Sequence, residues 1–240
     1  MSISLTEVRP PSEGCILKSM SMRTPSVPGE YYHVFNRGVE KRVVFSSDHD
    51  YQRFLILLFL LNNTAQVEVR NELRDNTLSK ILVKEQDPLV NIYSFALLPS
   101  HYHLLLSPVV EGGIAKFMQK LATGYTMYFN TKHERSGALF QGKYKIKQAT
   151  DKNYVKYLFE YIHLNPIRER FDASSGLIAK ELLVEAEQYP WSSLSVYSNQ
   201  SKGQLNRANL NPQLFEDLFG TYNNHQQLLL QWKDEEAPHT

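Results

Sequence analysis

Residues 90–106 read VNIYSFALLPSHYHLLL. Two apolar runs, 90–98 and 101–106, lie on either side of a Pro-Ser dipeptide. Short apolar runs that flank a turn signal are typical of a tight hairpin of two strands. The sequence therefore predicts a sheet that contains this hairpin, and the neighbouring segments are interpreted around it.

The segments around the hairpin alternate between strand and helix signals. Between 114 and 132 the apolar positions recur at spacings of three and four residues, as an amphipathic helix requires. The other expected elements are a strand at 31–36, a helix at about 49–63, an exposed basic loop and strand at 135–149, and a helix from Thr150 or Asp151 to about 164. The order strand, helix, strand, strand, helix, strand, helix predicts an α+β protein with a ferredoxin-like antiparallel sheet and helices packed on one face of it.

The remaining segments set the expected domain boundaries. Residues 1–29 are rich in Ser, Pro and Met without periodicity, so we expect a disordered lead-in. The main domain is expected at 30–197. Residues 198–240 are expected to form a helical C-terminal extension, with a helix near 212–232.

Two stretches of the main domain carry weak periodicity. Residues 65–88 are charged and are interpreted as an excursion between core elements. Beyond 171 the chain is interpreted as irregular up to a turn at 189–193.

Composition limits the class of protein. Hydrophobic residues make up 42% of the chain and charged residues 21%, which is typical of a globular protein. The longest apolar run, 54–61, is too short to span a bilayer, and the N-terminus lacks the basic-then-apolar layout of a secretory signal. Cys15 is the only cysteine, which excludes disulfide frameworks and cysteine-rich zinc sites. We therefore expect no membrane association and a reducing, cytoplasmic setting.

Basic residues gather in the middle of the chain. The formal net charge is only +1, but residues 116–170 contain eleven Lys and Arg against four Asp and Glu. Such an asymmetry fits a segment that binds a polyanion such as nucleic acid. A solvated basic helix face would give the same count, so charge alone leaves both interpretations open.

His101 and His103 are candidate metal ligands. Side chains two residues apart on a strand share a face, so the two imidazoles can hold one ion while Tyr102 points to the other side and packs. Two ordinary histidines at the start of a strand would have the same spacing.

Tyr161 and Asn165, in the segment YIHLNP, form the second candidate pair. At a spacing of four residues on a helix, a phenol and an amide oxygen face the same spot. The alternative is a core tyrosine in a helix that ends at Asn-Pro. The two pairs together fit attack on a phosphodiester, because a metal ion neutralises phosphate charge and a tyrosine can form a covalent intermediate that conserves bond energy for rejoining.

Five segments occur in a specific order: YYHVFNRG, LLPSHYHLLL, the helix around GYTMYFN, RSGALFQGKYK and YIHLNPIR. Together they resemble the HUH single-tyrosine transposases, especially the REP-associated tyrosine transposase branch. The resemblance covers about 31–197 and implies the ferredoxin-like fold of the HUH endonucleases and transposases. It implies that His101-Tyr102-His103 is the HUH motif, with Tyr102 as a departure from the smaller aliphatic residue usual at the middle position.

The resemblance also implies roles for the candidate residues. Tyr161 would be the nucleophile, and Asn165 would join His101 and His103 as the third metal ligand. Further implications are Mg²⁺ or Mn²⁺ as cofactor, single-stranded or hairpin DNA as partner, a 5′-phosphotyrosine intermediate, and association with the nucleoid when DNA is bound. By ligand softness alone, two imidazoles would also suit Zn²⁺.

Several other residues are candidate DNA contacts. Lys and Arg side chains would bind phosphates, and Phe140 and Tyr144 could stack on bases. His33 is interpreted as structural, and His163 as structural or as a neighbour of the metal ligands. The candidate DNA contacts are Arg37, Arg135, Gln141, Lys143, Lys145, Lys147 and Arg168.

Two other functions stay open at this point. The chain could be a DNA-binding protein that keeps the fold without the chemistry, or a metal-dependent nuclease that uses water while Tyr161 is a bystander. A DNA endonuclease and strand transferase is favoured, because His101, His103, Tyr161 and Asn165 are all present. Both a monomer and a homodimer are compatible with the sequence.

Overall fold

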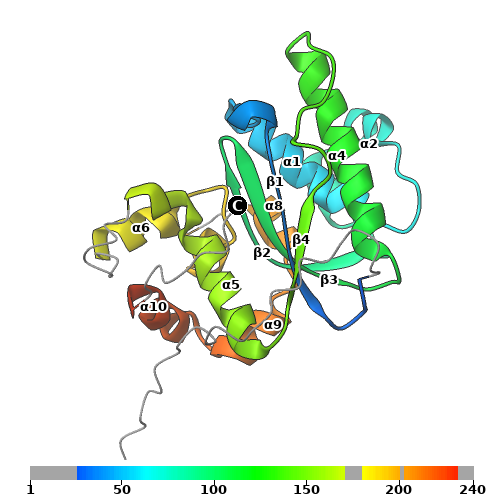
Figure 1. Ribbon diagram of the computed structural model, residues 1–240. Coiled ribbons are helices and arrows are strands. Elements are labelled where there is room, and N and C mark those ends of the chain that lie inside the picture. Colours follow the sequence, from blue (N-terminus) through cyan, green and yellow to red (C-terminus); the bar gives the residue numbers. More distant parts are fainter. Residues whose placement is uncertain (1–25, 171–179, 201–202, 232–240) are drawn as a thin grey trace, which may run out of the picture.

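The computed structural model describes residues 26–170, 180–200 and 203–231 (Figure 1). Most of the expected lead-in and the last residues of the expected extension lie outside the described residues. In chain order the elements are β1 (Tyr31–Arg37), η1 (Val39–Lys41), α1 (Asp48–Leu61), α2 (Val69–Asp75), α3 (Leu78–Leu82), β2 (Val90–Leu98), β3 (His101–Pro108), α4 (Gly113–Lys132), β4 (Lys145–Ala149), α5 (Lys152–Leu164), η2 (Asn165–Arg170), α6 (Lys180–Gln188), α7 (Leu194–Tyr197), α8 (Gln204–Ala208), α9 (Gln213–Phe219) and α10 (Tyr222–Gln231).

The sheet has four antiparallel strands in the order β2-β3-β1-β4. The helix α1 connects β1 to the hairpin of β2 and β3, and α4 connects that hairpin to β4. This path is the β-α-β-β-α-β arrangement of a ferredoxin-like sheet, so the predicted fold class is confirmed. The hairpin of residues 90–106 supplies one edge strand and one inner strand.

Helices cover both faces of the sheet. Figure 1 shows α1 and α4 on one side and α5 with α6 and α10 on the other, in agreement with two separate hydrophobic clusters. The prediction that all helices pack on one face is therefore wrong. The reason lies in the strands: every residue of β2 except Asn91 is buried, and a sheet that is apolar on both faces needs cover on both.

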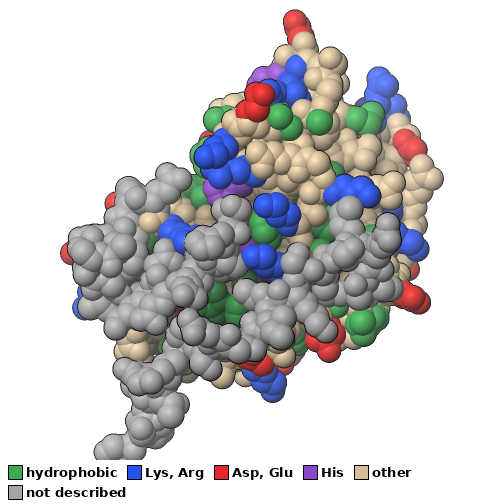
Figure 2. Space-filling view, viewed as in Figure 1, with side chains coloured by type: hydrophobic (Ala, Val, Ile, Leu, Met, Phe, Trp, Pro, Cys, Tyr) green, Lys and Arg blue, Asp and Glu red, His purple; other side chains and the backbone are tan. Residues whose placement is uncertain are grey.

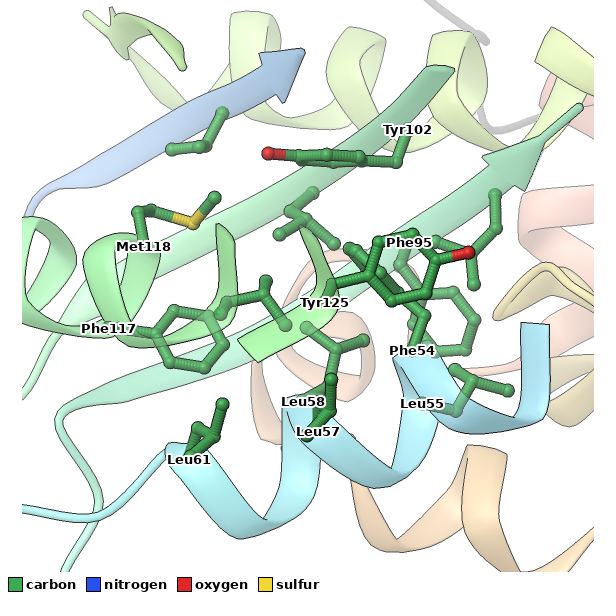
Figure 3. Close-up of a cluster of buried hydrophobic side chains, with 14 of the residues drawn as sticks. Phe54, Leu55, Leu57, Leu58, Leu61, Phe95, Tyr102, Phe117, Met118 and Tyr125 are labelled. Carbon is green, nitrogen blue, oxygen red and sulfur yellow. The ribbon is translucent and has the colours of Figure 1, made fainter. Parts of the chain in front are cut away.

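The core between the sheet and the first helix pair is rich in aromatic rings. Figure 3 shows Phe54 of α1 and Phe117 and Tyr125 of α4 among the side chains packed against the strands. The ring of Phe54 lies 5.1 Å from that of Tyr102 and 5.0 Å from that of Tyr125. Tyr102 is 1% exposed, so the middle residue of the His-Tyr-His motif packs into the core, as predicted.

Specific contacts lock α1 against α4. The backbone N–H of Ser47 donates to the Asp50 carboxylate (3.1 Å), which closes a capping box at the start of α1. The same buried carboxylate pairs with Lys132 of α4 at 2.7 Å. Burial opposes ionisation of Asp50, but hydrogen bonds from Lys132, Ser46 and Tyr128 hold the pKa of its carboxyl below the usual range. At the other end of α4, a Cβ on Gly113 would lie 2.2 Å from the carbonyl oxygen of Leu89, so only glycine fits there.

The weakly periodic stretches contain more helix than predicted. Residues 65–88 hold the short helices α2 and α3, and Ile81 of α3 is 1% exposed. The prediction of an irregular chain beyond 171 is wrong for 180–188, which form α6; residues 171–179 lie outside the described residues. Leu183 and Ala186 fix α6 in place, because both pack into the cluster around α5.

The expected C-terminal helix is broken into α9 and α10 at Gly220, whose φ is +68°. Phe215 and Phe219 of α9 pack edge-on against Phe159 of α5, with ring centroids 5.8 and 5.5 Å apart. These helices therefore extend the cover over α5. The described helices include none with the length and hydrophobicity of a membrane span.

Candidate active site

One face of the sheet, the face that α5 covers, collects candidate residues from three strands. Phe35 of β1 is paired with His103 on one side and with Lys145 on the other. Because side chains alternate along a strand, residues two positions away from this row share its face. The His, Lys and Arg side chains on this face are His101 and His103 of β3, His33 and Arg37 of β1, and Lys145 and Lys147 of β4.

The helix α5 brings the second candidate pair to these histidines. Asp151 caps the helix by accepting hydrogen bonds from the N–H groups of residues 153 and 154, both at 2.9 Å. Further along, the Tyr161 ring meets the His103 ring edge-on, with centroids 5.5 Å apart. The side-chain oxygen of Asn165 lies 3.3 Å from Nε2 of His101. The structure thus brings all four predicted residues together.

The two histidines differ in their hydrogen bonds. Nδ1 of His101 lies 3.0 Å from the Ser100 hydroxyl, and its Nε2 faces Asn165. Nδ1 of His103 lies 2.8 Å from Nε2 of His33, and both of these rings are 1% exposed. Nε2 of His103 is buried and has no hydrogen-bond partner among the described residues. His103 therefore keeps one ring nitrogen available.

Burial keeps His33 and His103 neutral. Burial, with a smaller contribution from Lys147, lowers the pKa of His33 to about 3. Burial and the nearby rings of His33 and His101, with Arg168 and Arg37, lower the pKa of His103 well below its usual value. A neutral imidazole is the form that binds metal ions.

Tyr161 is buried, at 1% exposure, and Arg168 covers it. The Arg168 guanidinium donates to the Tyr161 hydroxyl at 3.2 Å and lies 5.1 Å from the centre of its ring. The guanidinium can stabilise negative charge on the phenol oxygen and can bind a phosphate. Access of a substrate to the hydroxyl requires this contact to open.

A cavity of about 170 Å³ lies next to the two histidines. Arg37, Lys41 and Lys145 contribute three cationic side chains to its wall. Its lining consists of Phe35, Asn36, Arg37, Lys41, His101, His103, Gln141 and Lys145. Such a lining, cationic and rich in hydrogen-bond donors, suits an oxyanion such as a phosphate group.

Two loops complete this cavity. Lys41 and its neighbour Glu40 have left-handed backbone, with φ of 60° and 56°, which costs roughly 1–2 kcal/mol per non-glycine residue. The second loop is held to β1, because the N–H of Gln141 donates to the carbonyl of Arg37 (2.7 Å) and the Asn36 amide donates to the carbonyl of Gly142 (3.3 Å). The sequence analysis missed Lys41, and it gave no role to Asn36, which lies within the YYHVFNRG segment.

The remaining candidate DNA contacts lie at different depths. Lys143 is exposed in the bend before β4, and Lys147 is partly buried with its ammonium 5.9 Å from the centre of the Phe35 ring. Arg135 lines no part of the cavity; its guanidinium donates to Asn130 and to the carbonyl of Ala138, which organises the loop after α4. Figure 2 shows Lys and Arg side chains beside histidine surface near the centre of this view.

The two aromatic side chains that were predicted to stack on bases are less exposed than expected. Phe140 is 5% exposed and packs edge-on against Tyr102, so the prediction that it stacks on bases is wrong for this arrangement. Tyr144 is partly buried against the same core. His163 faces away from the two candidate pairs and bonds to Ser193 and His225 instead.

Two imidazoles and one amide oxygen form the donor set of this site. Within the described ranges, His, Cys, Asp and Glu side chains nowhere form a group of three that could hold a metal ion, so a site here would have to include an amide oxygen. His101, His103 and Asn165 offer two imidazole nitrogens and one such oxygen, and Nε2 of His103 lacks any other partner among the described residues. Adjacent ligands of an octahedral ion stand roughly 3 Å apart, close to the 3.3 Å between Asn165 and His101. These residues fit a divalent cation.

Comparisons with known proteins address the family. A comparison with curated proteins found no match. One solved structure, described as "Structure of the REP associates tyrosine transposase bound to a REP hairpin", is 12% identical over 78% of this chain and 90% of that chain, with a TM-score of 0.47. The family model "Transposase IS200 like" matches residues 51–165, which contain both histidines of β3, Tyr161 and Asn165. This match identifies a domain similar to the IS200-like transposases in residues 51–165.

Proposed function

We propose that this protein is a transposase-like, metal-dependent endonuclease and strand transferase that cuts single-stranded DNA with Tyr161 and forms a 5′-phosphotyrosine intermediate. The observation that carries the proposal is the packing of α5 on the sheet. It brings the Tyr161 ring against His103 and the Asn165 oxygen within 3.3 Å of Nε2 of His101. A nucleophile, a cation-binding set and a cationic cavity then meet at one place.

The chemistry is a transesterification. The Tyr161 oxygen attacks the phosphorus, a bond between them forms, and the bond from phosphorus to the 3′ oxygen breaks. The phenol loses its proton and the leaving oxygen gains one, which yields a free 3′ hydroxyl. Attack by a 3′ hydroxyl on the phosphotyrosine reverses these steps, and the DNA strand is rejoined without loss of bond energy.

The residues around the cavity bind and orient the phosphate. The DNA backbone would be held beside the histidines by Arg37, Lys41 and Lys145. The Arg168 guanidinium would release the Tyr161 hydroxyl and bind a substrate phosphate instead. His101, His103 and Asn165 would hold Mg²⁺ or Mn²⁺, and the bound ion would neutralise phosphate charge. An amide oxygen among the ligands suits these hard ions.

The partner that this site favours is single-stranded DNA, with a hairpin as the structured part. A nucleophile that is buried beneath Arg168 cannot reach a phosphate within a rigid duplex unless the strand is locally free. The excess of basic residues in 116–170 supports binding to the backbone. The same proposal includes action as a monomer or a homodimer. It also includes a location in the cytoplasm, at the nucleoid.

Covalent trapping tests the proposal. The full chain is incubated with labelled single-stranded hairpins in Mg²⁺ or Mn²⁺, and an adduct stable to SDS is expected. Tyr161→Phe should abolish the adduct while folding and DNA binding persist, because only one hydroxyl is removed. Tyr157→Phe is the matched control, since its ring stacks on that of Tyr161 at 6.2 Å one turn earlier in α5.

Each outcome separates the functions left open by the sequence. Free cleaved ends without an adduct would indicate a nuclease that uses water. Binding without cleavage would indicate a DNA-binding protein that has lost the chemistry. An adduct that persists in Tyr161→Phe and disappears in Tyr157→Phe would show that Tyr157 is the nucleophile.

A further inference from the structure

His33 is a buried side chain that contacts one of the candidate metal ligands. It is 1% exposed, and its Nε2 lies 2.8 Å from Nδ1 of His103. The pair is diagonal across β1 and β3, because the direct partner of His103 is Phe35, two residues further along. The two rings are nearly parallel, with centroids 5.1 Å apart and an angle of 20° between their planes.

Only one hydrogen occupies the contact between two neutral imidazoles, so two arrangements exist. In the first, Nδ1–H of His103 donates to His33, and Nε2 of His103 carries a lone pair. In the second, Nε2–H of His33 donates, and His103 carries its own hydrogen on Nε2. Only the first arrangement leaves Nε2 of His103, the nitrogen without a partner among the described residues, able to bind a cation.

We propose that His33 is a positioning residue that accepts the hydrogen of Nδ1 of His103 and thereby fixes the tautomer and ring orientation in which His103 binds a divalent cation. The inference rests on the proposed metal site. Metal-binding histidines generally donate their second N–H to a carboxylate, a carbonyl or water. Here a second imidazole takes that place.

An imidazole suits this neighbourhood better than a carboxylate would. The charged groups that act on the two rings are Lys147 at His33 and Arg168 and Arg37 at His103. A carboxylate at position 33 would pair with these cations and add negative charge where DNA phosphates must bind. A neutral acceptor orients His103 and leaves the positive charges for the polyanion.

Mn²⁺ affinity of the DNA-free full chain, measured by calorimetry or by electron paramagnetic resonance, tests the inference. His33→Leu should weaken Mn²⁺ binding by roughly 10–100-fold, the usual effect of removing such a partner. His33→Gln should recover most of the affinity, because its amide oxygen can accept the same hydrogen. The matched control is His225→Leu, which breaks a second buried His–His hydrogen bond (3.0 Å, to His163) and should lower thermal stability without changing Mn²⁺ affinity.

The outcomes separate this inference from the proposed function. Absence of Mn²⁺ binding in the wild-type chain would overturn both the metal site and the role of His33. Wild-type binding together with equally tight binding by folded His33→Leu would overturn the role of His33 alone. A nitrogen-detected NMR spectrum of the wild-type chain in Mg²⁺ decides the matter even where the variants fail to fold: the hydrogen of His103 is expected on Nδ1, and its presence on Nε2 would refute the inference.

Discussion

Two buried pairs of hydrogen-bonded histidines lie on the α5 side of the sheet, and they differ in what surrounds them. His33 and His103 are 2.8 Å apart, and His163 and His225 are 3.0 Å apart. In the second pair the chain of bonds continues, because Nε2 of His163 contacts the Ser193 hydroxyl at 2.8 Å, which in turn accepts the N–H of Phe95. In the first pair, His103, whose Nε2 has no hydrogen-bond partner among the described residues, lines a cationic cavity.

A nitrogen without a partner is not sufficient to identify a ligand. Nδ1 of His225 also lacks a hydrogen-bond partner among the described residues, but the rings of Phe215 and Phe219 lie 5.2 and 4.4 Å from that of His225. Neither benzyl ring offers a second ligand or a charge for phosphate. The difference shows that a buried histidine becomes a candidate ligand through its neighbours: a second imidazole, an amide oxygen and cations around a cavity.

The largest expected contrast comes from alanine at one member of each pair. His103→Ala, like His101→Ala, should remove Mn²⁺ binding and reduce cleavage by more than roughly 100-fold, since loss of a ligand exceeds loss of its neighbour. His163→Ala should leave cleavage intact at temperatures where it is folded, but should lower the free energy of unfolding by about 1–3 kcal/mol for each polar group left unpaired. Cleavage assays and urea unfolding measure both effects; full activity of His103→Ala in chelator would contradict the metal site.

The cations near the first pair should dominate DNA affinity. Replacing Lys143, Lys145 and Lys147 by Ala should flatten the log–log dependence of single-strand binding on salt by up to about 2, because each phosphate that a lysine neutralises contributes roughly 0.7 to that slope. The matched control removes three exposed charges of the α2–α3 region, as R70A, K80A and K84A. Fluorescence anisotropy at several salt concentrations gives the slopes. Equal slopes in both triple variants would show that these three lysines contact solvent and not DNA phosphates.

The polar neighbours of the two pairs should also behave differently. Asn165→Ala removes one neutral ligand that water can replace, so cleavage should fall by only about tenfold and recover partly at high Mn²⁺. Ser193→Ala, which breaks the network at His163, should instead destabilise the fold without altering the Mn²⁺ requirement. An unchanged metal requirement in Asn165→Ala would mean that Asn165 only ends α5.

The smallest predicted effect is a pH dependence of stability from the second pair. Burial lowers the pKa of His225 from 6.5 to about 3. Below pH 6.5, His225 is therefore protonated in the unfolded chain but stays neutral in the native state. The free energy of unfolding therefore falls as pH drops through this window, by up to about 1.4 kcal/mol per pH unit for each such histidine. His225→Leu should lose less stability than the wild type between about pH 7.5 and 5, by up to roughly 2 kcal/mol in urea unfolding. An equal loss in both proteins would show that burial does not lower the pKa of His225 in the native state.

Local rules made the hairpin and its histidines predictable. Alternation along β3 puts His101 and His103 on one face and Tyr102 on the other, and the spacing of four residues in α5 aligns Tyr161 with Asn165; none of this depends on distant parts of the chain. The ferredoxin-like order of strands and helices followed from the order of the periodic segments.

Long-range pairing explains what the sequence analysis missed. His33 meets His103 across 70 positions of sequence, and only the register of β1 on β3 decides this contact. Lys41 reaches the cavity through a left-handed turn at Glu40 and Lys41. This turn contains no glycine, so the sequence did not predict it. The cover on the second face of the sheet could not be predicted from α5 alone, because α6 is short and lies in a stretch of weak periodicity.

The opposite faces of β3 make the length of this hairpin as important as its composition. Insertion or deletion of one residue between the turn and Leu104 would send the two imidazoles into the aromatic core and bring Tyr102 out beside the cations, because one step along a strand exchanges its faces. A change of two residues would keep each side chain on its own face, although it would shift the partners of that side chain across the sheet by two positions. Over evolutionary time, as in loop grafting, each odd-numbered change in the length of this segment would therefore disrupt a core and a reaction centre in a single event.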